Sequence, residues 1–131
     1  MNYIKEKSVP ISINQAFDGI SFLSNRLPGV SSNGAGFCAL VNYRNGGVFL
    51  AHYDGYSEWE RHTHGDEMVM VVEGETRLIL VQNDEATSHL MLQSTLMIVP
   101  QNVWHRFESP KGVKILTITP QPTDHSIKRP K

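Results

Sequence analysis

The stretch that decides the fold reads GYSEWERHTHGDEMVMVVEG and spans residues 55–74. It holds two histidines one residue apart, His62 and His64, followed by the carboxylate of Glu67 and a run of valine and methionine that ends at Gly74. Alternate side chains of an extended chain point the same way, so a strand would project both histidines from one face. A helix would separate them by roughly 200 degrees. We therefore predict a strand in which the two rings can share one ligand.

A second stretch, PQNVWH at residues 100–105, follows further along the chain. Its proline stiffens the turn that leads into the strand carrying His105. Imidazole nitrogen and carboxylate oxygen together suit Fe, Mn, Zn, Ni or Cu, and such a set leaves coordination positions open for water, oxygen or substrate. The two stretches together predict a site for a divalent transition metal.

Both stretches resemble the two motifs of the cupins, G-x(5)-H-x-H-x(3,4)-E-x(6)-G and G-x(5)-P-x-G-x(2)-H-x(3)-N. Glu67 and Gly74 keep the spacing of the first motif, and Pro100 and His105 keep that of the second. The resemblance covers roughly residues 35–120. It implies four metal ligands: His62, His64, Glu67 and His105. It also implies that Glu67 is the catalytic ligand, the one best able to move and take up a proton.

The chain departs from the first motif between His64 and Glu67, where only two residues intervene. These two side chains have opposite parity along a strand, so they share a face only if Gly65 and Asp66 form a bulge or turn that resets it. Asp66 is the alternative carboxylate ligand. In the second motif Asn102 replaces a glycine, and asparagine tolerates the left-handed conformation that glycine would supply there.

The chain has 131 residues, enough for one domain with one core. Its hydrophobic fraction of 40% and charged fraction of 19% are those of an ordinary globular protein. A net charge of -1 gives no basic face for nucleic acid, so no nucleic-acid partner is expected. The N-terminus lacks a signal peptide and no apolar run reaches membrane-spanning length, which predicts a cytoplasmic protein without a membrane partner.

Turn signals divide the chain into short strands, the pattern of an all-β sandwich or barrel. With the resemblance, this predicts a cupin-type antiparallel jelly-roll β-barrel over residues 36–120, an N-terminal arm over 1–35 and a flexible tail over 121–131. Within the arm, Asn14 is expected to cap a short helix over residues 15–23. The strands are expected at about residues 37–43, 47–53, 66–73, 75–82, 87–92, 95–99, 104–108 and 113–119.

Several other side chains near the motifs admit more than one interpretation. His52 shares the parity of Leu50, so it could line the cavity or could be a satisfied core histidine. The neighbouring aromatic residues could line a substrate pocket, the core or a dimer face: Tyr53, Tyr56, Trp59, Trp104 and Phe107. Arg61 and Arg106 have opposite parity to the histidines beside them, which favours solvent or salt bridges over substrate binding. His89 and His125 are expected in solvent and in the tail.

Two functions follow from these residues. The favoured hypothesis is a metalloenzyme that acts on a small-molecule substrate, with oxygenase-type chemistry. The alternative is a non-catalytic module that binds or senses a small ligand. A homodimer is expected from the resemblance and from the need to cover sheet edges.

Overall fold

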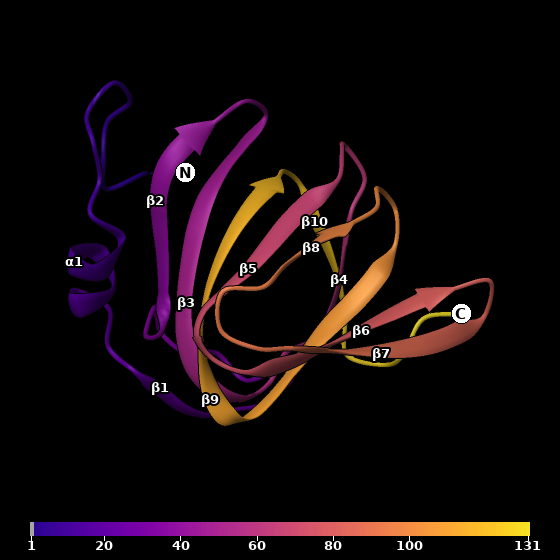
Figure 1. The fold of residues 1–131 in the computed structure, drawn as a ribbon. Helices are drawn as coiled ribbons and strands as arrows, with labels where there is room; N and C mark the ends of the chain where they lie inside the picture. The colour runs from indigo at the N-terminus through magenta and orange to yellow at the C-terminus, as the bar shows by residue number, and fades with distance from the viewer. Residues whose placement is uncertain (1) are drawn as a thin grey trace.

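The longest strand, β9 (Trp104–Pro120), pairs with four other strands and joins the two layers of the molecule (Figure 1). A computed structural model describes residues 2–131. Besides β9, the elements are α1 (Ile13–Asp18), β1 (Leu23–Arg26), β2 (Phe37–Tyr43), β3 (Gly46–Tyr56), β4 (Trp59–His62), β5 (Glu67–Gly74), β6 (Thr76–Gln82), β7 (Glu85–Met91), β8 (Leu96–Val99) and β10 (Thr123–Ser126).

β9 changes layer half-way along its length. Its first residues pair with β4 and β6, and its last residues pair with β3 and β5. We predicted two strands here with a turn at residues 110–112, whereas the structure has one strand that bends around Gly112 (φ +92°). A bend inside a strand brings the side chains of its two halves to the same interior, and His105 lies in the first half.

The strands belong to one sheet whose pairings, within residues 2–131, do not close into a ring. The prediction of an all-β jelly roll is confirmed, although its sheet does not close into a complete barrel. The reason is that β7 pairs with β6 alone and β8 with β5 alone, so no ladder joins the two layers on that side. In Figure 1 the two layers diverge from the bend of β9.

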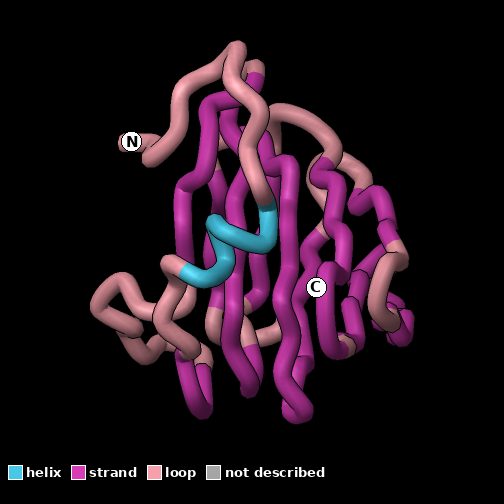
Figure 2. The backbone as a smooth tube through the Cα atoms, turned by 60° about the vertical axis from the view of Figure 1, so that its left-hand side comes forward, coloured by secondary structure: helices cyan, strands magenta, loops and turns pink. Residues whose placement is uncertain are grey.

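Two apolar clusters hold the layers in place. The inner cluster lies between the layers and includes Val69 and Val71 of β5, while Met68 and Met70 of the same strand pack against the outer cluster. Alternate side chains of β5 thus pack into different clusters, as expected for a strand buried on two faces. The outer cluster is covered by α1, which lies across the strands in Figure 2 and buries Phe17 against the sheet.

The helix is shorter than predicted and begins earlier. Ser12, not Asn14, is its N-cap, and the Ser12 hydroxyl accepts a hydrogen bond from the backbone N–H of Gln15 at 3.3 Å. The helix ends at Asp18, because Gly19 follows. Asn102 adopts the predicted left-handed conformation, with φ at 68°.

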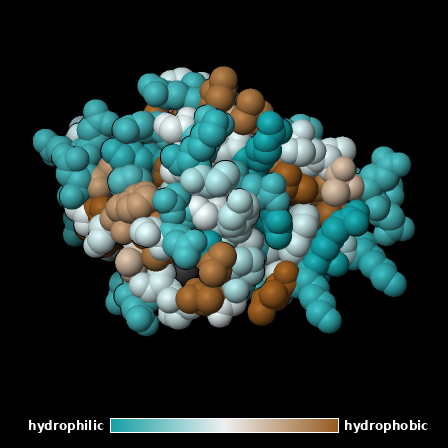
Figure 3. All heavy atoms as spheres, turned by 90° about the horizontal axis from the view of Figure 1, so that it is seen from below, coloured by the Kyte–Doolittle hydropathy of each residue, from teal (hydrophilic) through white to brown (hydrophobic). Residues whose placement is uncertain are grey.

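The arm and the C-terminal segment are more ordered than the sequence suggests. Backbone N–H groups of Ile4 and Lys5 donate to carbonyls of β2, so the arm covers the edge of that strand. β1 pairs in parallel with β3, and β10 pairs antiparallel with β4 where a flexible tail was predicted. Among residues 2–131 no helix has the length and apolarity needed to span a membrane. The face seen in Figure 3 is mainly hydrophilic, with apolar side chains in small separate groups.

Candidate metal centre

Three strands bring three predicted ligands together inside the fold. His62 ends β4, Glu67 begins β5 and His105 lies in β9. One ligand atom of each lies within 4.8 Å of the others, and the side chains are buried. His62 Nε2 lies 3.3 Å from Glu67 Oε2, and His105 Nε2 lies 3.0 Å from Glu67 Oε1.

The donor atoms of this cluster face one another and have no partner elsewhere in the described chain. Within the described chain, His62 Nε2, His105 Nε2 and Glu67 Oε1 are buried without a well-aligned hydrogen bond. Buried polar atoms without partners are costly, and three of them around one point fit a cation as the missing partner. Two imidazole nitrogens and one carboxylate are the donor set of a metal site with open coordination positions.

The other polar atoms of the three side chains are held by neighbours. His105 Nδ1 lies 3.0 Å from the carbonyl oxygen of Val103, and His62 Nδ1 lies 3.0 Å from the hydroxyl of Thr123. The hydroxyl of Thr119 donates to Glu67 Oε2 at 2.6 Å. Because a carbonyl oxygen only accepts hydrogen bonds, Nδ1 of His105 must carry a proton to bond Val103. In a neutral ring this leaves the Nε2 lone pair of His105 free to bind a metal.

Two of these groups, Glu67 and His105, have shifted pKa values. Burial alone would raise the pKa of Glu67, but hydrogen bonding and charge from His105 and His62 outweigh it and lower this pKa to about 2. Burial alone would lower the pKa of His105, but Glu67 reverses the effect and raises it. Glu67 is therefore an anion over the whole physiological range, ready to bind a cation.

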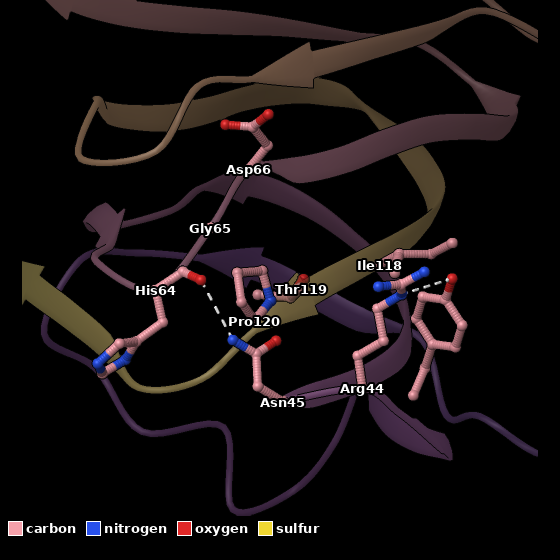
Figure 4. A pocket seen from close by; sticks show the side chains of 9 residues that line it. Arg44, Asn45, His64, Gly65, Asp66, Ile118, Thr119 and Pro120 are labelled. Carbon is pink, nitrogen blue, oxygen red and sulfur yellow. Dashed lines mark hydrogen bonds between the residues drawn. The ribbon is translucent and has the colours of Figure 1, made fainter.

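His64 and Asp66 do not join this cluster. His64 is exposed, and its Nδ1 lies 3.1 Å from the carbonyl oxygen of Gln121. Asp66 accepts a hydrogen bond from the backbone N–H of Gln101 at 2.8 Å. Figure 4 shows both side chains around a separate surface pocket, pointing in different directions from the chain on either side of Gly65. The parity conflict between His64 and Glu67 is thus not resolved by a bulge.

The sequence predicted His64 beside His62 on one face of the strand, and the structure places Glu60 there instead. Glu60 shares the face of His62 on β4, pairs in register with His105 and lines the same cavity. The signal was present in the sequence. When four residues are allowed before Glu67, the second histidine of the motif is His62, and its first position falls on Glu60.

A cavity of about 770 Å³ opens in front of His62 and Glu67. This volume lies within the range of small-molecule sites. Its wall includes Tyr53 and Phe107, two of the aromatic residues considered from the sequence, and also His125, whose Nδ1 lies 3.3 Å from Glu58 Oε2. The cavity thus combines apolar wall residues with polar ones, among them His62 and Glu67 of the cluster.

The remaining candidates lie elsewhere. His52 faces away from Tyr53 on β3, and its ring packs edge-on against Phe22 at 4.9 Å. Arg61 forms a salt bridge with Asp124 at 2.8 Å. The other predicted residues are placed as follows: Arg106 pairs with Glu108 and lies over Trp59, Arg61 lies over Trp104, Tyr56 lines a different pocket, and exposed His89 bonds Thr87.

Comparison with known proteins identifies the fold. No family model and no curated protein matches the sequence. A cupin-2 domain protein of Shewanella frigidimarina has a TM-score of 0.62 at 20% identity, covering 85% of this chain and 94% of that one. A conserved protein of unknown function from Streptococcus pyogenes has a TM-score of 0.60 at 15% identity, covering 93% and 96%. A hydroquinone 1,2-dioxygenase in complex with Cd²⁺ and 4-hydroxybenzonitrile has a TM-score of 0.53 at 19% identity, covering 62% and 61%.

The chain therefore has the cupin fold, as its two motifs suggested. More particularly, it is a small chain of this fold with a candidate His–Glu–His metal centre. At these identities the likeness establishes the fold alone, since one fold hosts many chemistries.

Proposed function

We propose that this protein is a metalloenzyme that binds a divalent transition metal through His62, Glu67 and His105 and carries out oxygen-dependent chemistry on a small organic substrate. The observation that carries the proposal is the set of three buried donor atoms that have no partner outside their own cluster, two of whose residues, His62 and Glu67, line a cavity. Two histidines and one carboxylate with open positions favour iron(II), although Mn, Zn, Ni and Cu accept the same ligands. A divalent ion held there would supply a Lewis-acid centre with free positions for oxygen or substrate.

The protein's own groups would then have distinct tasks. His62 and His105 are fixed at Nδ1 and present Nε2. Glu67 is held at Oε2 by Thr119, so its Oε1 would face the metal, and Glu67 is the ligand that could move and take up a proton from a bound substrate. Glu60, in the cavity wall, is a second carboxylate that could accept a proton without leaving the site.

The proposal is tested by metal content and oxygen consumption. Wild-type protein is loaded with iron(II) without oxygen, and bound metal is measured together with that of His62→Ala, Glu67→Gln and His105→Ala. Each variant should lose more affinity than the roughly 10- to 100-fold caused by loss of a supporting hydrogen bond. His64→Ala is the matched control and should bind the metal as the wild type does.

Three results would count against this function. Metal binding that survives all three substitutions would remove the site, and metal binding that depends on His64 would relocate it. Ligand-dependent stabilisation without oxygen consumption would indicate the alternative predicted from the sequence, a non-catalytic binding module. A cytoplasmic location and a homodimer remain predictions of the same proposal.

A further inference from the structure

Arg26 is the one arginine or lysine in the cavity wall, counting residues 2–131. It is half-buried at the end of β1, in the arm that the sequence marked as irregular. Its side chain shares the cavity with His62 and Glu67, on a wall formed by aromatic rings. A fixed positive charge therefore faces the same space as the proposed metal centre.

Aromatic rings hold the guanidinium in place without neutralising it. Its central carbon lies 4.8 Å from the ring centre of Phe37 and 4.7 Å from that of Tyr53. Such contacts orient an arginine while its N–H groups stay free for another partner. In the described part of the chain no acidic side chain forms a salt bridge with Arg26, whereas Arg61 and Arg106 each have one.

The backbone is shaped to bring Arg26 to this position. β1 pairs in parallel with β3 and places Arg26 opposite Gly55, whose φ is +108°. A Cβ atom at Gly55 would lie 2.6 Å from the backbone nitrogen of Arg26, closer than real side chains allow. Glycine at this position therefore permits both the left-handed conformation and the close approach of the two strands.

We propose that Arg26 binds the carboxylate of a small acid with an apolar body, and that this acid is the substrate of the metalloenzyme proposed above. A guanidinium pairs with a carboxylate through two parallel hydrogen bonds, which fixes orientation as well as charge. The wall that Arg26 shares with the metal ligands also includes the apolar side chains of Ala51, Phe107 and Ile115. The acid would lie with its carboxylate at Arg26 and its apolar body along this wall.

The charges of the cavity favour an anion that carries one negative charge. A divalent ion and Arg26 together exceed the charge of the two carboxylates in the wall, Glu60 and Glu67, so a monoanion completes the balance. Glu60 in the same wall disfavours the second negative charge of a phosphate ester. The inference therefore names a carboxylate rather than a phosphate.

The experiment measures binding of benzoate, 4-hydroxybenzoate and phenylacetate by calorimetry, each beside its amide and beside phenyl phosphate. The full chain is used, once loaded with zinc and once after chelation. At least one acid should bind wild-type protein more tightly than its amide and than phenyl phosphate. Arg26→Gln should weaken that acid about 10- to 100-fold, the effect of losing a hydrogen bond to a charged group, and leave the amide unchanged. Arg26→Lys should bind the acid with an affinity between those of the wild type and of Arg26→Gln.

Arg44→Gln is the matched control, because Arg44 lies over the ring of Tyr43 outside this cavity and should bind the acid as the wild type does. Circular dichroism of every variant checks that the substitution has not unfolded the protein. The inference is overturned if no acid binds better than its amide, if phenyl phosphate binds best, or if Arg26→Gln binds the acid as the wild type does. Zinc content is measured in parallel. Arg26-dependent binding of the acid without zinc binding would refute the metal centre alone.

Discussion

Glu67 has two possible counter-charges, a proton on His105 or a metal ion. Without metal, its low pKa and the raised pKa of His105 are two consequences of the same buried ion pair. With metal, His105 must give up that proton because only a neutral imidazole nitrogen binds the ion. Proton and metal therefore compete for the same Nε2 atom.

This competition predicts how the stability of metal-free protein depends on pH. The pKa of Glu67 is lowered from 4.5 to about 2, so its contribution is present above pH 4.5 and is lost as pH falls towards 2. The pKa of His105 is raised above 6.5, so its contribution is present below pH 6.5 and is lost as pH rises through the raised value. Urea unfolding of chelated protein should show its highest free energy of unfolding between these limits, with a fall on the acid side on the order of 3 kcal/mol.

The zinc-loaded protein should behave differently on the alkaline side. Its metal affinity should rise with pH through the pKa of His105, because binding releases that proton. Glu67→Gln removes the negative charge. In the metal-free variant the free energy of unfolding should therefore change less with pH on both the acid and the alkaline side. A metal-free protein that is equally stable at pH 5 and pH 8 would contradict the ion pair.

Of the four ligands predicted from the sequence, the structure brings the donor atoms of three together: His62, Glu67 and His105. For the fourth, His64, the sequence showed a parity conflict with Glu67 that Gly65 and Asp66 were expected to reset, and the structure does not bring His64 into the cluster. His62 and His64 were read as one pair because H-x-H is conspicuous, yet β4 ends at His62 and the chain turns away through Gly65. Glu60 satisfies the alternation that His64 cannot, and the strand boundary in the structure decides between the two alignments of the motif that the sequence allows.

At the scale of elements, β10 supports the metal centre from outside the two motifs. It pairs with β4 in register, which places Thr123 opposite His62. The threonine hydroxyl reaches His62 Nδ1 at 3.0 Å. The C-terminal strand therefore fixes the orientation of one ligand, a task for which partners of metal-bound histidines are commonly used.

Thr123→Val should reduce metal affinity by about 10-fold or more, because it removes this hydrogen bond and keeps the shape of the side chain. The strand itself should remain paired, since its backbone hydrogen bonds are unchanged. Competition with a coloured zinc chelator measures the affinity.

Thr87→Val is the control, because Thr87 bonds exposed His89 on the distant β6–β7 hairpin and should not affect metal binding. Equal zinc affinity in Thr123→Val and wild-type protein would show that β10 has no part in the centre.

The sequence predicts the bounds of strands with strong apolar periodicity better than those of short polar strands. β2, β5, β6 and β8 lie within a residue or two of their predicted bounds, because alternation and turn residues mark them. β1 and β10 are four residues each and mainly polar, so they form only because β3 and β4 offer a free edge. Such pairing depends on tertiary context, which local sequence does not report.

At the scale of the whole molecule, the outer face of the sheet is covered only in part. α1 and the arm cover the side formed by β2 and β3 (Figure 2). On β8 the outward side chains of Leu96 and Ile98 are 61% and 50% exposed, next to Met70 and Met68 of β5. The same apolar layer thus continues beyond the part that the helix covers, and a second copy of the chain could cover it.

The expected homodimer should therefore depend on β8. Ile98→Lys places a charge on this outward face, where it would oppose a dimer contact but leave Val99 and the inner core unchanged. Sedimentation velocity should show a dimer for wild-type protein and a monomer for Ile98→Lys. Val30→Lys changes an equally apolar exposed residue in the arm and should remain dimeric. If wild-type protein sediments as a monomer, or if both variants stay dimeric, then the exposed layer on β8 is not the interface. A dimer that forms elsewhere would have to cover another surface of at least roughly 1,200 Å² in total, the lower size of stable interfaces.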